Sequence, residues 1–549
     1  VPSGRISEIC LWGAAMVLCS VISISGNTVA NRMSSAVARD AVRAMRHDLF
    51  AKVSGLSCAQ IDSVSIPSLV SRLTSDTYNV HRLFSGMQRM GVRAPILFLG
   101  GVALTLTMEP VLTLVMLGAM PFITAVVYFV SGKGIPLYTK AQSEVDSMVR
   151  VVRENVSGIR IIKALSKTGH ERRRFAEANA RVTEREKRAG FVMGTTNPAM
   201  ALFLNMGFVC VIIAGAYRVN AFKTETGEIL AFLTYFTIIL NATLTITRVF
   251  TMYSQGVASA ERIAEVMRLP CGFPLYETGH KESEYHVSFE NVRFSYDGKT
   301  DMLRGISFGL RRGETLGILG ETGCGKSTVI QLLLRFYDVS SGVIRINGDD
   351  VRSIPADRLY TMFGIALQND VLFAETISGN IDFGRRLTSD QIKAAADFAQ
   401  AEHFVDSLED GFSHRLAQRG ANLSGGQRQR ILIARAIAAE PEILILDDSS
   451  SALDYKTDAK FRVALREHFR GTTTIIVAQR ISSIKDANRI MVLDRGQVAG
   501  YGTHEEMARY CPVYRETLES QMGSAGVPAA TNREIAGKAL CGEGGAIAG

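Results

Sequence analysis

A glycine-rich segment of the sequence has the composition of a phosphate-binding loop. It runs Gly320-Glu-Thr-Gly-Cys-Gly-Lys-Ser-Thr328, between the apolar runs 315–319 and 329–334, and this order of strand, loop and helix is what such a loop requires. Its glycines let backbone N–H groups turn toward phosphate oxygens, and the dipole of the following helix attracts the same anion. Lys326 can reach the β and γ phosphates, and the hydroxyl of Ser327 can bind Mg²⁺. The residues predicted to hold the nucleotide here are Gly320, Gly323, Cys324, Gly325, Lys326, Ser327 and Thr328.

A second apolar run ends in two carboxylates. Residues 443–446 are Ile-Leu-Ile-Leu, and Asp447 and Asp448 follow them. At the end of a parallel strand beside a phosphate-binding loop, the first carboxylate is placed to bind the metal ion. Without that loop, the same run would be interpreted as an ordinary core strand.

Between these two motifs lies Leu423-Ser-Gly-Gly-Gln427, which leads into an alanine-rich helical segment. Ser424 can cap that helix, while Gly425 and Gly426 leave its first N–H groups free to bind an anion. This segment is therefore a second candidate for contact with a phosphate group.

The composition places these motifs in a protein with both membrane and soluble parts. The 549 residues exceed one ordinary domain, and 47% of them are hydrophobic; the mean hydropathy of +0.13 is high for a soluble chain of this size. Long apolar runs gather before Thr251, whereas the later part alternates short apolar runs, glycine turns and charged segments. The expected fold is an all-α transmembrane helical bundle followed by an α/β P-loop domain.

Five apolar runs are long enough, or nearly so, to cross a bilayer. They comprise residues 9–29, 94–107, 111–130, 195–216 and 229–250. The long connections after the first and third runs are rich in Arg and Lys, so the positive-inside rule places them in the cytoplasm. The fifth run then returns the chain to the cytoplasm. Because the number of runs is odd and the sequence opens with Val1, we expect that a first helix is missing from it.

The remaining segments define the expected domain limits. Pro67 and Gly158 mark bends in the two basic connections, where a short helix could touch a soluble domain; amphipathic helices lying on the membrane are the alternative. A stretch with Pro, Gly and charged residues indicates a linker, and the Gly- and Ala-rich end has no periodicity. We expect a transmembrane domain at 1–266, a linker at 267–285, a nucleotide-binding domain at 286–521 and a disordered tail at 522–549.

Charge and cysteine content exclude two other kinds of site. The net charge is +8, but much of the basic excess lies in connections between apolar runs, so we assign it to membrane topology rather than to a nucleic-acid partner. The eight cysteines are scattered without a CxxC pair. Neither a disulfide framework nor a zinc site is indicated.

Taken together, the motifs make the chain resemble an ABC transporter half of the exporter type, over essentially its whole length apart from the tail after Met522. The motifs occur in the family's order, and the LSGGQ pentapeptide is highly specific. The resemblance implies the type IV exporter fold with six spans per half, ATP and Mg²⁺ as cofactors, and two nucleotide-binding domains facing head to tail. The connections near Pro67 and Gly158 match the family's coupling helices.

The same resemblance assigns roles to further residues. Tyr296 would stack on adenine, Gln368 would contact the metal together with Ser327 and Asp447, and Asp454 would belong to the D-loop. The signature motif would face the ATP of the partner subunit through Ser424, Gly425, Gly426 and Gln427.

Two positions depart from the family pattern. Asp448 stands where the family normally has the Glu that polarises the attacking water, and its carboxylate is withdrawn by roughly 1.5 Å, which can cost on the order of 10²-fold when positioning carries catalysis. Gln479 replaces the switch histidine, and its amide carries no charge. Beside an intact P-loop and an intact signature, both changes indicate a site that holds ATP more readily than it hydrolyses it.

An impaired site implies an unequal partner. The resemblance is nearest to the degenerate-site subunit of bacterial heterodimeric multidrug exporters, so we expect a second, non-identical half-subunit with an intact Glu and His. The chain would sit in the bacterial inner membrane in contact with lipid, with its nucleotide-binding domain in the cytoplasm, and export small molecules, hydrophobic drugs or lipids being the expected class. The alternatives are a homodimeric lipid or peptide exporter and an ABC protein whose ATP binding gates a passage.

Overall fold

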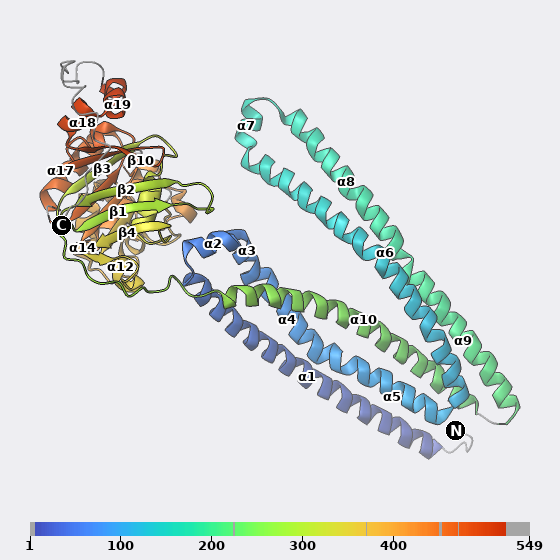
Figure 1. Cartoon of the computed structure of the whole chain (residues 1–549). Helices are drawn as coiled ribbons and strands as arrows, with labels where there is room; N and C mark the ends of the chain where they lie inside the picture. Colours follow the sequence, from blue (N-terminus) through green and yellow to red (C-terminus); the bar gives the residue numbers. More distant parts are fainter. Residues whose placement is uncertain (1–5, 223–224, 369, 450–452, 470, 523–549) are drawn as a thin grey trace. The chain divides into compact units, whose positions relative to one another are not determined.

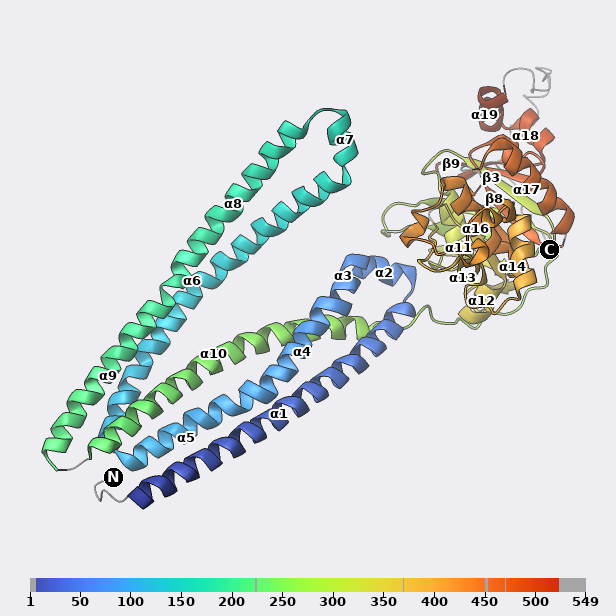
Figure 2. The same ribbon diagram turned by 180° about the vertical axis from the view of Figure 1, so that it is seen from behind.

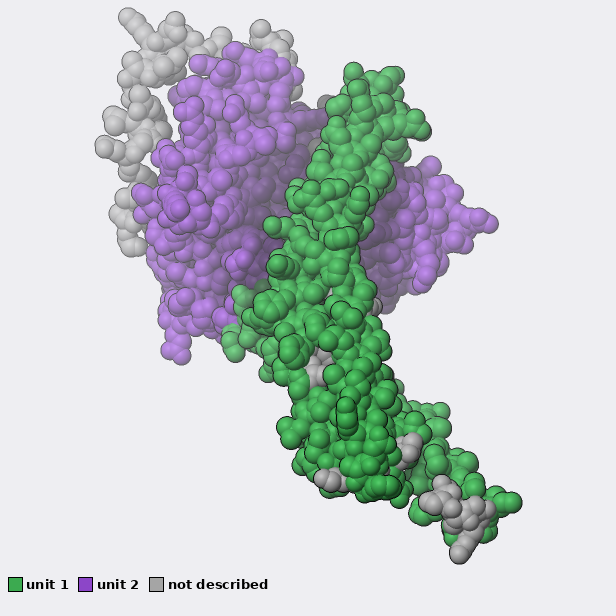
Figure 3. Space-filling model, turned by 90° about the vertical axis from the view of Figure 1, so that its right-hand side faces the viewer, with its two compact units in different colours: residues 1–53, 67–268 green, residues 54–66, 269–549 purple. Residues whose placement is uncertain are grey.

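The computed structural model describes residues 6–222, 225–368, 370–449, 453–469 and 471–522, which form two compact units (Figures 1 and 3). Within those limits, the first unit takes in Val1–Val53 and Pro67–Arg268, and the second takes in Ser54–Ile66 and Leu269–Gly549. The tail expected at 522–549 lies, apart from Met522, outside the described residues.

Long helices make up the first unit. Helix α6 packs along α8 and α9, whereas α10 packs along α4 and α5 (Figures 1 and 2). A small apolar core that includes Leu112, Met116, Phe232 and Phe236 joins these helices, so both aromatic side chains serve packing rather than lining an open passage. The helices are α1 (Ile6–Ser54), α3 (Ile66–Ser71), α4 (Thr77–Gly86), α5 (Val92–Met108), α6 (Pro110–Ser157), α7 (Ile159–Ala164), α8 (Thr168–Gly194), α9 (Thr196–Asn220) and α10 (Thr226–Arg268).

Four helices among the described residues are long and apolar enough to cross a membrane. They lie within Ile6–Ser54, Ile66–Met108, Thr168–Asn220 and Gly227–Arg268. Four of the five expected spans fall inside them. The run expected at 111–130 lies within α6, which continues as one helix to Ser157; of this run, the described residues include the shorter apolar helix Pro110–Phe122. The chain is therefore a membrane protein.

A partly buried ionic cluster ties α10 to the segment before α4. Two π-helical turns, η1 (Arg72–Asp76) and η2 (Met87–Gly91), interrupt the α3 to α5 region. Arg72 donates to the Glu265 carboxylate at 2.8 Å and to the backbone carbonyl of Arg262 at 2.8 Å. Arg262 in turn donates to the buried carboxylate of Asp76, with one contact at 3.0 Å. Arg72 and Asp76 are buried, whereas the side chains of Glu265 and Arg262 are 64% and 49% exposed, so each buried charge is paired with a partner that stays in contact with water.

Two sheets form the frame of the second unit. The four-stranded sheet has the antiparallel order β2-β1-β4-β5. The six-stranded sheet has the order β10-β9-β3-β8-β7-β6, which is parallel except for the β10 edge. Its strands are β3 (Thr315–Gly320), β6 (Phe363–Ala366), β7 (Ile443–Asp447), β8 (Thr473–Val477), β9 (Arg489–Asp494) and β10 (Gln497–Gly502); the smaller sheet has β1 (Val287–Phe294), β2 (Leu303–Leu310), β4 (Ser341–Ile346) and β5 (Asp349–Asp350).

The parallel sheet is buried because helices cover it. Strand β7 is an apolar run up to Asp447, and β8 is buried at all but one of its positions, as expected of parallel strands covered on both faces. Side chains of β3 and β7 pack in one core with the helix after the phosphate-binding loop, α11 (Lys326–Leu333), and other side chains of β7 pack in a second core with α16 (Gly425–Ile437). The sheet therefore holds its strand ends in fixed positions.

The segment Ser54–Ile66 belongs to the second unit, although the sequence suggested that residues 1–266 form one domain. It contains α2 (Cys58–Val64), which begins at a capping box formed by Ser57 and Gln60. The chain turns back at Ser65, whose φ of 71° is unusual for a residue other than glycine. At the other boundary, α10 continues to Arg268, so the connection between the units begins two residues later than expected.

Candidate nucleotide-binding site

The predicted site residues follow the carboxyl ends of four neighbouring strands. The phosphate-binding loop follows β3, Gln479 follows β8, Asp448 follows β7 and Gln368 follows β6. These strands are adjacent and parallel in the order β3-β8-β7-β6, so their carboxyl ends meet at one edge of the sheet. A cavity of about 220 Å³ lies there, lined by Met302, Thr322, Gly323, Gly325, Lys326, Ser327, Thr328, Gln368, Asp447, Asp448, Val477, Ala478 and Gln479.

Glycine is required in the loop itself. Gly323 and Gly325 have φ values of 87° and 107°, in the region that side chains disfavour. A Cβ atom at Gly325 would lie 2.6 Å from the Cδ2 atom of Leu303. The loop is therefore locked in a conformation that leads directly into the N-terminus of α11, where an anion is favoured.

The ammonium of Lys326 is bonded to the loop. It donates to the carbonyl oxygens of Gly320 at 2.6 Å and Glu321 at 2.7 Å. Its Nζ atom also lies 4.0 Å from the buried sulfur of Cys324. Two carbonyl dipoles thus hold the cation at the mouth of the cavity, where phosphate oxygens can bind it.

The oxygen donors beside the loop suit a magnesium ion. Asp447 is only 4% exposed, and this burial raises the pKa of its carboxyl, while a hydrogen bond with Ser327 opposes the rise. Hydroxyl, carboxylate and amide oxygens are the ligands that Mg²⁺ prefers. Ser327, Asp447 and Gln368 together form a donor set that fits this ion.

Asp448 is held by two side-chain amides. Its carboxylate accepts from Nε2 of Gln479 at 3.3 Å and from Nε2 of Gln368 at 3.5 Å. Burial raises the pKa of Asp448, and the charges of Lys326 and Arg480 lower it. The φ of Asp448 is 49°, in the left-handed region that residues other than glycine seldom adopt. The backbone therefore turns at this residue, directly after the end of β7.

Tyr296 does not line this cavity, but it borders the loop helix. Its hydroxyl donates to Oε1 of Gln331 at 2.5 Å and lies 3.2 Å from Oγ1 of Thr328. Tyr296 is 49% exposed, so much of the ring is accessible for contact with a flat ligand.

The signature and D-loop residues begin helices. Ser424 and Gln427 form a capping box at the start of α16, with Ser424 Oγ accepting from the Gln427 N–H at 3.3 Å. Asp454 caps α17 (Tyr455–His468) and accepts from the Thr457 N–H at 3.0 Å. Within the described chain, the cavity lining includes none of Ser424–Gln427 and not Asp454. Residues 451 and 452 of the predicted D-loop, which comprises residues 451–454, lie outside the described residues.

Comparisons with known proteins bear on the identity of this chain. A family model for the ABC transporter transmembrane region matches residues 3–243, and an ABC transporter model matches residues 303–451. An ABC transporter ATP-binding protein of Mycobacterium tuberculosis is 33% identical over 544 residues, which cover 96% of this chain and 92% of that protein. The chain belongs to the ABC transporter family.

Further relatives of this chain are also ABC transporter proteins. An ABC transporter ATP-binding protein of Bacillus subtilis is 33% identical and covers 94% of the chain and 90% of that protein. A fatty acid ABC transporter ATP-binding/permease protein of Mycobacterium tuberculosis is also 33% identical, over 86% of this chain and 75% of that protein.

A solved structure shows the fold. A bacterial Atm1-family ABC exporter with ATP bound has a TM-score of 0.80 and 24% identity, covering 96% of this chain and 93% of the other. The predicted fold class is confirmed: a type IV exporter bundle precedes an α/β ABC ATPase domain, which implies that the protein binds ATP.

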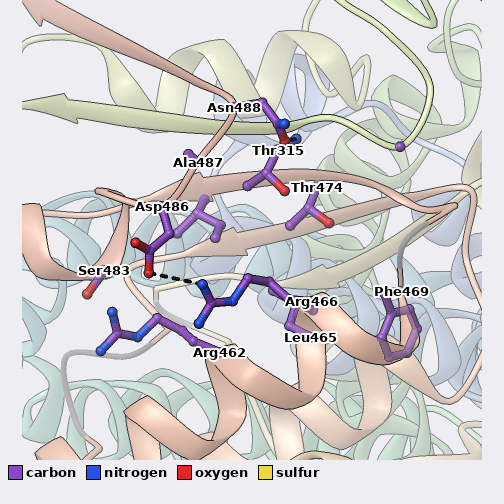
Figure 4. Close-up of a pocket in the computed structure, with 12 residues that line it drawn as sticks. Thr315, Arg462, Leu465, Arg466, Phe469, Thr474, Ser483, Asp486, Ala487 and Asn488 are labelled. Carbon is purple, nitrogen blue, oxygen red and sulfur yellow. Dashed lines mark hydrogen bonds and ion pairs between the residues drawn. The ribbon is translucent and has the colours of Figure 1, made fainter. Parts of the chain in front are cut away.

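A larger cavity elsewhere in the ABC transporter domain has a different character. It measures about 320 Å³ and lies at the amino-terminal ends of β3 and β8, away from the phosphate-binding loop (Figure 4). Arg466 pairs with Asp486 at 3.4 Å, and Arg462 pairs with Asp458 at 3.1 Å. These arginines already have carboxylate partners. We therefore assign the nucleotide to the cavity beside the phosphate-binding loop, although at about 220 Å³ it is the smaller of the two.

Sequence reasoning missed part of the lining. Met302, Thr322, Val477 and Ala478 line the phosphate cavity beside the predicted residues. Thr322 lies within the loop motif and could have been included, whereas nothing in the local sequence distinguishes Met302.

Proposed function

We propose that this ABC transporter is the degenerate-site subunit of a heterodimeric exporter. It would hold ATP at its own P-loop, while hydrolysis would occur mainly at the partner's site. The observation that carries the proposal is the pairing of Asp448 with Gln479 at 3.3 Å, in the positions of the family's Glu and His.

The chemistry of that pair supports retention of ATP. A general base must reach the proton of the attacking water, and Asp448 is one methylene shorter than Glu. Gln479 can donate a hydrogen bond but cannot take up or release a proton. Water beside the γ phosphate would be poorly activated, although Lys326 and the loop would still bind the phosphates.

A magnesium ion would be held by Ser327, Asp447 and Gln368. When bound, it would neutralise charge on the β and γ phosphate oxygens. The buried carboxylate of Asp447 would then have a cation as partner, which offsets the cost of its burial.

An intact signature supports a role for this chain in the second site. Ser424 and Gln427 preserve the capping box, so the first N–H groups of α16 are positioned for an anion. In a head-to-tail pair they would complete a site whose P-loop belongs to a non-identical half-subunit with intact Glu and His. That subunit would supply the group that activates water.

The transported compound would be hydrophobic, a drug or a lipid. The likeness to a fatty acid transporter supports this class. Asn205 and Asn241, in α9 and α10, are exposed in this single chain and are candidates for a polar contact in the assembled passage. The basic connections support an orientation in the bacterial inner membrane with the ATPase domain in the cytoplasm.

ATP hydrolysis by the isolated chain tests the proposal. The chain is purified alone in lipid and, separately, together with co-expressed half-subunits from the same source. Little hydrolysis by the chain alone, and substantial hydrolysis by a mixed complex, is the expected result. Hydrolysis at ordinary exporter speed by the chain alone would overturn it.

A further inference from the structure

Three aromatic rings connect the expected adenine contact to α2. The rings of Tyr296 and Tyr337 meet edge to face, with centroids 5.2 Å apart and planes at 86°. Phe294 packs on both, at 4.7 Å from Tyr296 and 5.7 Å from Tyr337. The hydroxyl of Tyr337 donates to Oδ2 of Asp62, in α2, at 2.5 Å. All these residues lie in the second unit.

The first ring of this series is fixed from one side. The hydroxyl of Tyr296 is bonded to Gln331 and Thr328, both on the helix that follows the phosphate-binding loop. The ring therefore cannot slide freely along that helix. A nucleotide base that stacks on the exposed surface of Tyr296 would restrict the motion of this ring. The same ring also contacts Phe294 and Tyr337.

The last contact is a hydrogen bond to a charged group. Burial, together with the Asp62 carboxylate, raises the pKa of Tyr337, so the phenol stays protonated as the donor. Hydrogen bonds to charged acceptors are stronger than neutral ones. Elsewhere α2 is bonded to the connecting segment, for example from Gln60 to the Pro270 carbonyl at 3.1 Å. The Asp62 bond thus joins α2 to a residue next to the nucleotide-binding elements.

The chain itself continues from α2 into the membrane helices. Helix α1 ends at Ser54 and α3 begins at Ile66, on either side of α2. A change in how α2 is held is therefore passed to α1 and α3 through the backbone. Gln368, by contrast, lies beside the phosphate end of the site, next to Asp448.

We propose that Tyr337 is a positioning residue through which α2 responds to the base of the bound nucleotide, separately from any response to its phosphates. This inference rests on the proposed function for the binding of ATP at this P-loop, and it also needs Tyr296 to stack on adenine, the role that the family resemblance implies. It implies that a ligand filling only the phosphate-binding loop leaves the Tyr337 contact to α2 unchanged.

Hydrogen exchange in residues 55–64 tests the inference. The full chain, in its natively purified assembly in lipid, is compared without ligand, with saturating MgATP and with saturating magnesium tripolyphosphate. Exchange in α2 should slow by about tenfold with ATP, the effect expected from strengthening a bond to a charged group, and should not change with tripolyphosphate. Equal slowing by both ligands would overturn the inference.

Variants separate this inference from the proposed function. Tyr337→Phe and, independently, Asp62→Ala should abolish most of the ATP effect on α2 without abolishing ATP binding, since each removes one partner of the hydrogen bond. Tyr501→Phe is the matched control, because it removes a hydroxyl that donates to the Gly309 carbonyl at 2.7 Å, far from α2 in sequence and contacts. If both test variants keep the full ATP effect, the inference is wrong.

The affinity of Tyr296→Ala for ATP shows whether a negative result concerns adenine stacking or the role of Tyr337. A marked loss of affinity supports adenine stacking, and the Tyr337 result then decides the inference alone. Unchanged affinity would contradict the assumed role of Tyr296, and the inference would fall with it, whereas the roles of Asp448 and Gln479 would be untouched.

Discussion

The side-chain amide of Gln479 donates a hydrogen bond of 3.3 Å to the carboxylate of Asp448. Gln368 approaches the same oxygen at 3.5 Å. Both partners are neutral amides, so neither can exchange a proton with the carboxylate. The two departures from the family pattern therefore act on one group, and each should modify the effect of the other.

The first prediction concerns the pair itself. Asp448→Glu should raise ATP turnover of the assembled complex, because it restores the reach of the carboxylate, by up to about 10²-fold at this site. Adding Gln479→His should raise it again, by a factor that differs from the effect of Gln479→His alone, since contacting residues are coupled. Single-turnover ATPase measurements check this. Asp357→Glu, in α12 (Ala356–Thr361), is the control, and a double variant no faster than the parent would contradict the prediction.

The second prediction concerns the signature motif. Ser424→Ala should destabilise the chain by about 1 kcal/mol through loss of the cap and should also lower hydrolysis by the mixed complex. Thr388→Ala removes an equivalent capping box from α14 (Ser389–Phe398), outside the motif. Both variants should lose similar stability in thermal unfolding, but only Ser424→Ala should lose activity. Equal activity of the two would argue against a role for Ser424 at the partner's ATP.

The third prediction concerns the ionic cluster of the first unit. Asp76→Ala removes the buried carboxylate that accepts from Arg262, whose half-exposed guanidinium stays hydrated, and should lower stability by about 1.5 kcal/mol, the value of hydrogen bonds to a charged group. Asp40→Ala is the control, because the Asp40 pair with Arg39 is exposed at 3.0 Å, and it should change stability by less than about 1 kcal/mol. Thermal unfolding of the chain in lipid gives both values. Similar unfolding temperatures for the two variants would contradict the assigned importance of the cluster.

The fourth prediction concerns pH. His286 is 3% exposed, its Nδ1 lies 2.6 Å from Oγ1 of Thr473, and burial, aided by Arg312 and opposed by Glu442, lowers its pKa to about 4. The unfolded chain takes up this proton near pH 6.5, whereas the folded chain does so only near pH 4. Stability should therefore fall as the pH drops from about 6.5 toward 4, and His286 should contribute no pH dependence above that window.

Two histidine variants test this pH dependence. His286→Asn keeps a hydrogen-bonding side chain but cannot be protonated, so it should flatten the loss of stability at acid pH. His280→Asn is the control, since His280 is exposed and pairs with Asp349. Unfolding temperatures measured between pH 7 and 5 should separate the two variants, and parallel curves would rule out His286 as the cause.

The phosphate end of the site could be predicted because its chemistry is local. The glycines and Lys326 occupy consecutive positions, and the apolar run before Asp447 identifies a buried parallel strand. The convergence of Gln368 and Gln479 on Asp448 depends on pairing between strands that are far apart in the sequence. It follows from the pairing of β6, β7 and β8, in which Asp447 lies opposite Val477, and no local pattern specifies that register.

The position of α2 could be predicted only in part. Pro67 indicated a bend, but the short helix ends before it, at Val64, and the turn is made by Ser65 with a positive φ. Serine carries no strong signal for that conformation. The assignment of Ser54–Ile66 to the second unit depends on contacts such as Asp62 with Tyr337, which join residues 275 positions apart.

The state of the nucleotide in the native assembly tests the central claim most directly. Mass spectrometry of the complex purified from its membrane, with the bound nucleotides identified, gives both the subunits and the nucleotide. The account predicts one copy of this chain with one different half-subunit, and intact ATP retained on the P-loop of Lys326. Two copies of this chain, carrying ADP and turning over ATP at ordinary exporter speed, would contradict it.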